Sequence, residues 1–444
     1  MKIDNLNNGG IFVADLKVGN MRLMGNVKVP PSKSMAHRAI ICASLSEGVS
    51  KIENIDFSDD IIATMEAMKA LGAKIYQNKN YIEIQGINHN EDNKELKIID
   101  CNESGSTLRF LVPISLLIPG KKKFIGRGNL GKRPLNTFYE IFEQDNIEYS
   151  FEEGILNLQL EGTLKGGEYY LAGNISSQFI TGLLFTLPLI NRDSKMIITT
   201  EMESKGYIDL TLSALRDFGI EIINNDYKEF IIKGNQQYKA RNYRVEGDYS
   251  QATFFLAANS IGNKVEIDDV LPNSAQGDKE ALDILARMGM SIQWNKSKNR
   301  IVPVKNIGLK ATVIDGSQCP DIIPVLSVVA ALAQGTTKII KVGRLRIKEC
   351  DRLKAVASEL TKLGAKIEEK EDGLIIEGVE TLKGGVEVWS WKDHRIAMTL
   401  AIAATRCEEP IILKDYECIS KSYPSFFDDY RRLGGIASEW NVGK

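Results

Sequence analysis

The 444-residue sequence has little of what several common kinds of functional site require. It contains 3 histidines, and its 6 cysteines lie far apart with no Cys-x-x-Cys pair, so no cluster of metal ligands is visible. Scattered cysteines are typical of free thiols in a reducing cytoplasm. We therefore expect a cytoplasmic protein that binds no metal.

Long hydrophobic runs and an excess of one charge are also lacking. The longest apolar stretch, residues 179–190, is too short to span a bilayer, and residues 1–10 lack the apolar core of a signal peptide. The formal net charge of −2 argues against a general nucleic-acid or membrane-surface binder. The phosphate-binding motifs G-x-x-x-x-G-K-[ST] and G-x-G-x-x-G in its usual context are missing, as is the nucleophile motif G-x-S-x-G. Any anion site must therefore be a local concentration of cations.

What the chain does contain is a repeat with a period of about 72 residues. A helix end followed by a strand recurs at Gly72, Asn146, Gly219, Gly289, Gly364 and Gly434. Glycine or asparagine is typical of the position just after a helix, where φ is positive. Mostly apolar helices, which we expect to be buried, begin near Ser34, Ser104, Ser176, Asp248, Asp321 and Asp393.

Each repeat is predicted to be a β-α-β-α-β-β unit whose second helix is amphipathic. We expect an α/β fold in which three units form residues 32–244 and three more form residues 1–31 plus 245–444. In this division the strand before Pro31 returns to the second domain, so the connection is double. Such a hinge would let the two halves close on a ligand.

The residues that could bind or react with a ligand lie near the starts of the predicted buried helices. Lys33 and Arg38 would stand at the positive end of the first helix, which is unfavourable unless an anion binds there. The alternative is a serine-capped helix with two solvated basic residues. If the N-termini of the helices in each domain point into one cleft, their dipoles add together there. The positive charges of eight candidate cations would join them: Lys33, Arg38, Arg109, Arg346, Lys348, Arg352, Arg395 and Lys421.

Each of the other motifs also has a purely structural interpretation. Ser176-Ser177-Gln178 could simply cap a helix, and residues 346–352 could form a solvated face of salt bridges. His394 could be a packing histidine. Asp321 and Glu349, as carboxylates among cations, are candidate acid–base groups. The recurrence of these motifs at the same repeat position favours the functional interpretation.

Several motifs together resemble one enzyme family over essentially the whole chain. They are Pro31-Ser32-Lys33-Ser34 with His37-Arg38-Ala39, Ser176-Ser177-Gln178-Phe179, residues 346–352, Asp393-His394-Arg395 and Lys421-Ser422-Tyr423-Pro424. Their order and residues resemble the EPSP synthases, or 3-phosphoshikimate 1-carboxyvinyltransferases. The resemblance implies a two-domain inverted α/β barrel. It also implies transfer of the enolpyruvyl group of phosphoenolpyruvate to the 5-hydroxyl of shikimate 3-phosphate, on the route to chorismate, by a monomer without a cofactor.

The resemblance also implies roles for individual residues. Those implied to contact shikimate 3-phosphate are Lys33, Ser34, Arg38, Ser176, Ser177, Gln178, Ser204, Tyr207, Asp321 and Lys348. Those implied to contact phosphoenolpyruvate are Lys33, Gly105, Gln178, Arg352, Arg395 and Lys421. Asp321 resembles the base near the 5-hydroxyl, and Glu349, with Lys33 or Lys421, resembles the proton donor to the methylene carbon. No metal site is implied.

Three positions depart from the family pattern. Glu103 and Arg344 each stand where an asparagine is usual, and Asn129 stands at an arginine position, for which Arg127 or Arg133 could substitute. The nearest alternative is a UDP-N-acetylglucosamine enolpyruvyl transferase. That family has an asparagine in place of Ser34 and a loop cysteine that has no counterpart near Arg127. A second alternative is a non-catalytic sensor of sugar phosphates, against which the retained Lys33, Asp321 and Glu349 argue.

Overall fold

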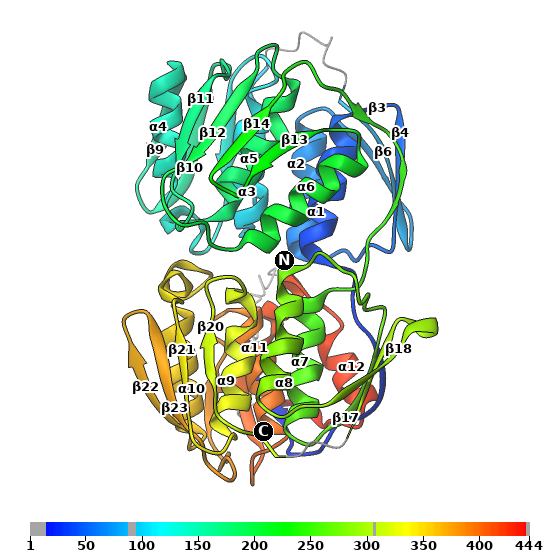
Figure 1. Cartoon of the computed structure of the whole chain (residues 1–444), viewed down its shortest axis with the longest axis vertical. Coiled ribbons are helices and arrows are strands. Elements are labelled where there is room, and N and C mark those ends of the chain that lie inside the picture. Colours follow the sequence, from blue (N-terminus) through cyan, green and yellow to red (C-terminus); the bar gives the residue numbers. More distant parts are fainter. Residues whose placement is uncertain (1–14, 88–94, 305–307, 441–444) are drawn as a thin grey trace, which may run out of the picture.

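The computed structural model describes residues 15–87, 95–304 and 308–440, so the expectation for residues 1–10 lies outside the described residues. Its buried hydrophobic side chains form two separate clusters, one within residues 36–245 and one within residues 16–29 and 249–437. Figure 1 shows the corresponding lobes one above the other. The N lobe runs from α1 (Lys33–Leu45) to β16 (Asn242–Arg244). The C lobe comprises β1 (Asp15–Val18), β2 (Met24–Lys28) and all elements from α7 (Tyr249–Ser260) to β26 (Ala437–Trp440). The domain division at 32–244 stays a prediction.

Among the described residues, each lobe has three four-stranded sheets, which are given below with hydrogen-bonded neighbours in order. The first N-lobe sheet has the order β16, β4 (Val49–Glu53), β6 (Tyr81–Gln85), β5 (Lys74–Gln77). The second has the order β7 (Lys97–Asp100), β8 (Lys122–Ile125), β10 (Ile155–Glu161), β9 (Glu148–Glu152). The third has the order β11 (Glu168–Leu171), β12 (Ser194–Ile198), β14 (Glu229–Ile232), β13 (Ile222–Asn225). The first C-lobe sheet has the order β18 (Ile292–Asn295), β19 (Arg300–Pro303), β17 (Lys264–Asp268), β2. The second has the order β20 (Val313–Asp315), β21 (Thr336–Ile340), β23 (Gly373–Glu377), β22 (Lys366–Lys370). The third has the order β24 (Glu387–Trp389), β25 (Ile411–Lys414), β1, β26. A short pair, β15 (Tyr238–Lys239)–β3 (Ser46–Glu47), adds to the N lobe.

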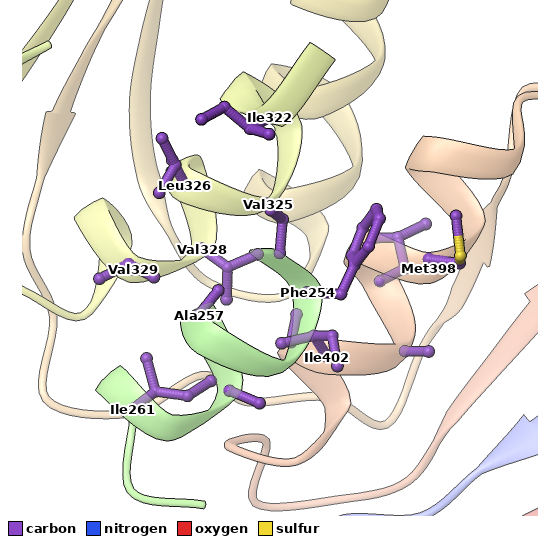
Figure 2. Packing of buried hydrophobic residues seen from close by; sticks show 14 of the residues in the cluster. Phe254, Ala257, Ile261, Ile322, Val325, Leu326, Val328, Val329, Met398 and Ile402 are labelled. Atoms are coloured by element: carbon purple, nitrogen blue, oxygen red, sulfur yellow. The ribbon is translucent and has the colours of Figure 1, made fainter. Parts of the chain in front are cut away.

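Two kinds of helix alternate along the chain, as the repeat predicts. The buried central helices are α1, α3 (Gly105–Ser115), α5 (Ser177–Thr186), α7, α9 (Ile323–Ala331) and α11 (His394–Ala404). The second helices of the units are α2 (Asp59–Ala70), α4 (Asn136–Asp145), α6 (Lys205–Asp217), α8 (Ala281–Arg287), α10 (Arg352–Lys362) and α12 (Phe426–Arg432). Figure 2 shows how the central helices of the C lobe meet, with Phe254 and Ala257 of α7 packed among Val325, Val328 and Ile402. Burial on every face explains why these helices have few polar positions.

The helix ends confirm both markers of the repeat. Backbone φ is positive at Gly72, Asn146, Gly219, Gly289, Gly364 and Gly434. Side chains cap most central helices: Ser32, Ser104, Ser176, Asp248 and Asp393 each accept a hydrogen bond from a backbone amide of the first turn. Asp321 is the exception, because it lies in a 3-10 turn, Pro320–Ile322, and α9 begins only at Ile323. Its carboxylate is therefore free of capping and can face the cations described below.

The two lobes exchange one strand each. β2, which precedes α1, pairs in parallel with β17 of the C lobe, and β16, which precedes α7, pairs in parallel with β4 of the N lobe. The two crossing segments run side by side: the Ser32 amide donates to the Glu246 carbonyl at 2.7 Å, and the Asp248 amide donates to the Pro30 carbonyl at 2.9 Å. The connection between the lobes is thus double.

The last repeat is completed by the first strand of the described chain. β1 lies between β25 and β26, antiparallel to both. This is the position that β23, the second strand of the unit's own hairpin, occupies between β21 and β22 in the preceding repeat. The sequence pattern did not predict this closure.

Candidate active site

A cavity between the lobes gathers the polar residues of many segments. Of the site residues predicted from the sequence, its walls contain Lys33, Ser34, Arg38, Gly105, Ser176, Ser177, Gln178, Ser204, Tyr207, Asp321, Lys348, Glu349, Arg352 and Arg395. Lys421 does not line the cavity, although it is buried. Residues up to about 360 positions apart therefore meet at one place, which the sequence pattern alone could only suggest.

The N-lobe wall is formed by the first turns of α1, α3 and α5. The Arg38 guanidinium donates to the Ser34 and Tyr207 carbonyls, at 2.7 and 2.9 Å. Arg109 donates to Gln178 Oε1 at 2.8 Å, and Gln178 in turn donates to Ser106 Oγ at 3.0 Å. Within the described residues, neither guanidinium has an ion pair with a carboxylate. This wall therefore offers positive charge, together with helix N-termini, to an anion.

The C-lobe wall is organised around Arg352, whose side chain is 1% exposed. Its guanidinium contacts Asp321 at 3.0 Å, Glu349 at 2.7 Å and Asp393 at 2.7 Å. Burial alone would raise the pKa of Glu349, but Arg352 and other nearby cations hold that pKa well below its usual range. One buried arginine thus contacts both acid–base candidates and contributes to their ionisation.

Asp321 is the second carboxylate of this wall. Arg395 Nη2 lies 3.0 Å from Asp321 Oδ2, and Lys348 Nζ lies 3.5 Å from Asp321 Oδ1. Burial would raise the pKa of Asp321, yet Arg395, Lys348 and Arg352 lower it well below the ordinary value. Asp321 is thus ionised and available as a hydrogen-bond acceptor.

Lys33 has a carboxylate partner that the sequence analysis missed. Its ammonium lies 2.7 Å from Asp60 Oδ2, and Asp60 also lines the cavity. Burial favours a neutral Asp60, but Lys33 and Lys421 outweigh it and lower the pKa of Asp60. An acidic first turn on an amphipathic helix is an ordinary helix-stabilising feature, so the sequence held no signal that set Asp60 apart.

The structure distinguishes between the two arginines that could replace the usual one at Asn129. Arg133 has a side chain that is 8% exposed, lines the cavity and lies 3.4 Å from Glu349 Oε1. Arg127 is 69% exposed and pairs with Asp100. A Cβ at Gly105 would lie 2.5 Å from Arg133 Nη1, so the guanidinium occupies space that a larger residue at position 105 would take. Arg133 is therefore the arginine of this site.

One of the candidate cations was misassigned. Arg346 does not line the cavity but pairs with Asp351 and Glu369, at 2.8 and 2.7 Å, as the solvated salt-bridge interpretation expects. Arg344 lies in the cavity wall instead, donates to Ser204 Oγ at 2.8 Å and lies 3.0 Å from Glu203 Oε2. Both arginines belong to the turn Gly343–Ile347, yet only Arg344 lines the cavity.

A contact accounts for the departure at Glu103, and burial decides between the two interpretations of His394. The Glu103 carboxylate lies 3.3 Å from Lys421 Nζ, so the unexpected negative charge has a partner. His394 also lines the cavity, with both ring nitrogens buried and without hydrogen-bond partners among the residues described. Burial, together with nearby Lys33 and Arg395, lowers the pKa of His394 well below its usual value. It is a neutral wall residue and not a packing histidine with satisfied nitrogens.

The lobes touch around the cavity, so this is a closed arrangement. The Lys33 amide donates to Asp248 Oδ2 at 3.0 Å, and Ser420 Oγ donates to Asp59 Oδ2 at 2.6 Å. On the other side, a Cβ at Gly206 would lie 2.5 Å from the Gly277 Cα. Such close approach of two backbones requires glycine at position 206.

All 6 cysteines are free, as expected. Within residues 15–87, 95–304 and 308–440, no group of three or more His, Cys, Asp or Glu side chains is placed to hold a metal ion. Over the same ranges, no helix has the length and hydropathy needed to cross a membrane.

Comparison with known families decides the membership of the chain. The family model described as EPSP synthase (3-phosphoshikimate 1-carboxyvinyltransferase) matches residues 18–430. The chain belongs to the EPSP synthase family. Among curated proteins, the 3-phosphoshikimate 1-carboxyvinyltransferases of Clostridium beijerinckii and Clostridioides difficile are 65% and 64% identical, and each match covers 97% of this chain and 100% of the relative.

The fold agrees with a solved structure of the same family. The EPSP synthase of Acinetobacter baumannii matches with a TM-score of 0.79 and 25% identity, over 96% of this chain and 100% of that one. The resemblance to EPSP synthases and the two-domain α/β fold expected from the sequence are thus confirmed. Membership in this family also disfavours the UDP-N-acetylglucosamine enolpyruvyl transferase alternative.

Proposed function

We propose that the protein transfers the enolpyruvyl group of phosphoenolpyruvate to the 5-hydroxyl of shikimate 3-phosphate and releases inorganic phosphate. The observation that carries the proposal is the interlobe cavity itself. Its cations outnumber its carboxylates, and two of those carboxylates, Asp321 and Glu349, face the same space. Two polyanionic substrates that repel each other in water can be held there side by side.

Shikimate 3-phosphate is expected on the N-lobe wall and phosphoenolpyruvate near Arg352. Ser176, Ser177 and Ser204 offer hydroxyls to the phosphate, and Arg344 adds a guanidinium beside Ser204. Arg133, Arg352 and Arg395 also line the cavity, and we expect them to contact phosphoenolpyruvate. Lys33 and Gln178 also line the cavity, and we expect each to contact both substrates, as the family resemblance implies.

The arriving anion also prepares the proton donor. In the protein alone, Arg352, Arg133 and Lys421 hold the pKa of Glu349 low. Phosphoenolpyruvate brings negative charge to the same cations, which raises the pKa of Glu349 and allows it to take up a proton. Glu349 then protonates the methylene carbon, while Asp321 accepts the proton of the 5-hydroxyl as its oxygen attacks.

The addition gives a tetrahedral intermediate that carries both groups. Elimination then removes a methyl proton, breaks the carbon–oxygen bond to phosphate and restores the double bond. Charge interactions in these steps are expected to be stronger in a cavity between two lobes than in open water. The reaction is expected in the cytoplasm, and the monomeric state stays a prediction.

A coupled assay for inorganic phosphate tests the proposal. We expect phosphate release only when phosphoenolpyruvate and shikimate 3-phosphate are both supplied, and none with UDP-N-acetylglucosamine as the acceptor. A sensor of sugar phosphates would instead bind shikimate 3-phosphate, as measured by calorimetry, without any turnover.

A further inference from the structure

A buried carboxylate that no sequence motif pointed to lies directly behind the cavity. Asp278, in the turn Gly277–Glu280, is 3% exposed. Its Oδ2 accepts hydrogen bonds from Ser250 Oγ and, at 3.3 Å, from Tyr207 Oη. In the described part of the chain, its Oδ1 is buried with no hydrogen-bond partner. A buried carboxylate with one unsatisfied oxygen is costly and calls for an explanation.

The Tyr207 hydroxyl connects this carboxylate to the proposed base. Tyr207 Oη lies 3.1 Å from Asp321 Oδ2 and 3.3 Å from Asp278 Oδ2. A phenol has one hydrogen, so at any moment it can donate to only one of the two carboxylates. The arrangement carboxylate–hydroxyl–carboxylate is therefore a path along which a proton can move by two short transfers.

The two carboxylates differ sharply in their affinity for a proton. Burial and the neighbouring charge of Asp321 raise the pKa of Asp278 to about 6, against the opposing effects of Arg395 and the Ser250 hydrogen bond. Asp248 also faces Asp278 and raises this pKa further. Asp321, surrounded by cations, has a pKa well below its ordinary value. Asp278, two hydrogen bonds away through Tyr207, is therefore a better acceptor for a proton taken up by Asp321.

We propose that Asp278 is the final acceptor of the substrate's 5-hydroxyl proton, which reaches it from Asp321 through Tyr207. The inference rests on the proposed function. The substrate O–H bond breaks as an O–H bond forms on Asp321. That proton then passes to Tyr207 Oη as the original phenolic proton passes to Asp278 Oδ2. Asp321 and Tyr207 end as they began, and Asp278 gains one proton, which returns to solvent or substrate before the next turnover.

The decisive variant is Asp278→Asn, which keeps the size and shape of the side chain. We expect kcat to fall by about 10- to 100-fold, at or below the lower end of the range for loss of direct acid–base assistance, with KM for both substrates within about twofold. Wild-type kcat should fall as pH drops through about 6, because a protonated Asp278 cannot accept a proton. This acid limb should be missing in the variant. A merely structural role for Asp278 would lower kcat or stability without removing the limb.

Two further variants guard against a misfolded protein. Ser250→Ala removes the other hydrogen bond to Asp278 and should leave kcat within about threefold. Tyr207→Phe breaks the path but keeps both carboxylates, and its loss of kcat should not add to that of Asp278→Asn in the double variant. Additive losses, or an unchanged acid limb in Asp278→Asn, would overturn the relay. If the wild type released no phosphate from its two substrates, the proposed function would fail instead.

Discussion

The two walls of the cavity differ in the partners of their buried arginines, which are neutral in the N lobe and carboxylates in the C lobe. Burial lowers the pKa of Arg38 to about 10 and that of Arg109 to about 9, because their hydrogen-bond partners are neutral. Burial acts in the same direction on Arg352 and Arg395, but neighbouring carboxylates outweigh it and raise both pKa values. The N-lobe wall therefore stores uncompensated positive charge, whereas the C-lobe wall is internally balanced.

The helix caps follow the same division. Ser32, Ser104 and Ser176 cap the central helices of the N lobe with neutral hydroxyls, so the positive end of each helix remains available. In the C lobe, Asp248 and Asp393 cap two of the three with negative charge. The N lobe thus offers an anion positive charge that no carboxylate offsets, while the balanced C lobe supplies groups whose protonation responds when an anion arrives.

The largest effect should come from removing a carboxylate of the C-lobe wall. Asp321→Asn is expected to lower kcat by about 10²- to 10⁴-fold, because the hydroxyl proton loses its first acceptor, with substrate affinity largely kept. Glu349→Gln should behave alike. Steady-state kinetics and calorimetric binding measure both effects. Glu369→Gln, which removes an equivalent charge outside the cavity, is the matched control. Undiminished turnover in the two cavity variants would remove their assigned roles.

Replacing one arginine from each wall tests the difference in charge balance. Arg352→Met should lower the free energy of unfolding by about 3–5 kcal/mol, because three carboxylates lose the buried cation that they share. Arg109→Met leaves no carboxylate unpaired and should cost much less, while anion binding to the N lobe weakens. Urea unfolding and calorimetry separate the two outcomes. Equal losses of stability would contradict the distinction between the walls.

Two neighbouring arginines provide a sharper comparison at the junction of the lobes. Arg344→Asn should raise KM for shikimate 3-phosphate by about tenfold, equivalent to about 1.4 kcal/mol, with KM for phosphoenolpyruvate unchanged. Arg346→Asn, which alters a side chain outside the cavity, should change neither constant by more than about twofold. If unphosphorylated shikimate binds equally to wild type and Arg344→Asn, the lost contact is one to the phosphate group.

The smallest effect concerns the partner of Lys421. Glu103→Gln removes the carboxylate 3.3 Å from the lysine ammonium and should lower KM for phosphoenolpyruvate about two- to threefold at low salt. The Glu103 side chain is 45% exposed, so the effect should fade as the ionic strength rises. If KM for phosphoenolpyruvate were the same in Glu103→Gln and wild type at low salt, Glu103 would not compete with phosphoenolpyruvate for Lys421.

The regular parts of the molecule were predictable because they are local. Six helix ends and six helix starts recur at a constant spacing, and both rest on backbone conformation that a few neighbouring residues determine. The choice between Arg127 and Arg133, or between Arg344 and Arg346, depends on which way one turn faces the opposite lobe. Asp60 and Asp278 gain their importance from partners on other segments, so no pattern within the sequence could single them out.

The strand that completes the last sheet has a consequence for how the polypeptide is made. The N lobe, from α1 to β16, is one continuous stretch that can fold as soon as it leaves the ribosome. β1 and β2 emerge earlier, yet the partners of β2 follow some 240 residues later and those of β1 about 400. β1 and β2 therefore remain unpaired while much of the chain is synthesised, and this interval is when the nascent chain is most exposed to mispairing with another copy.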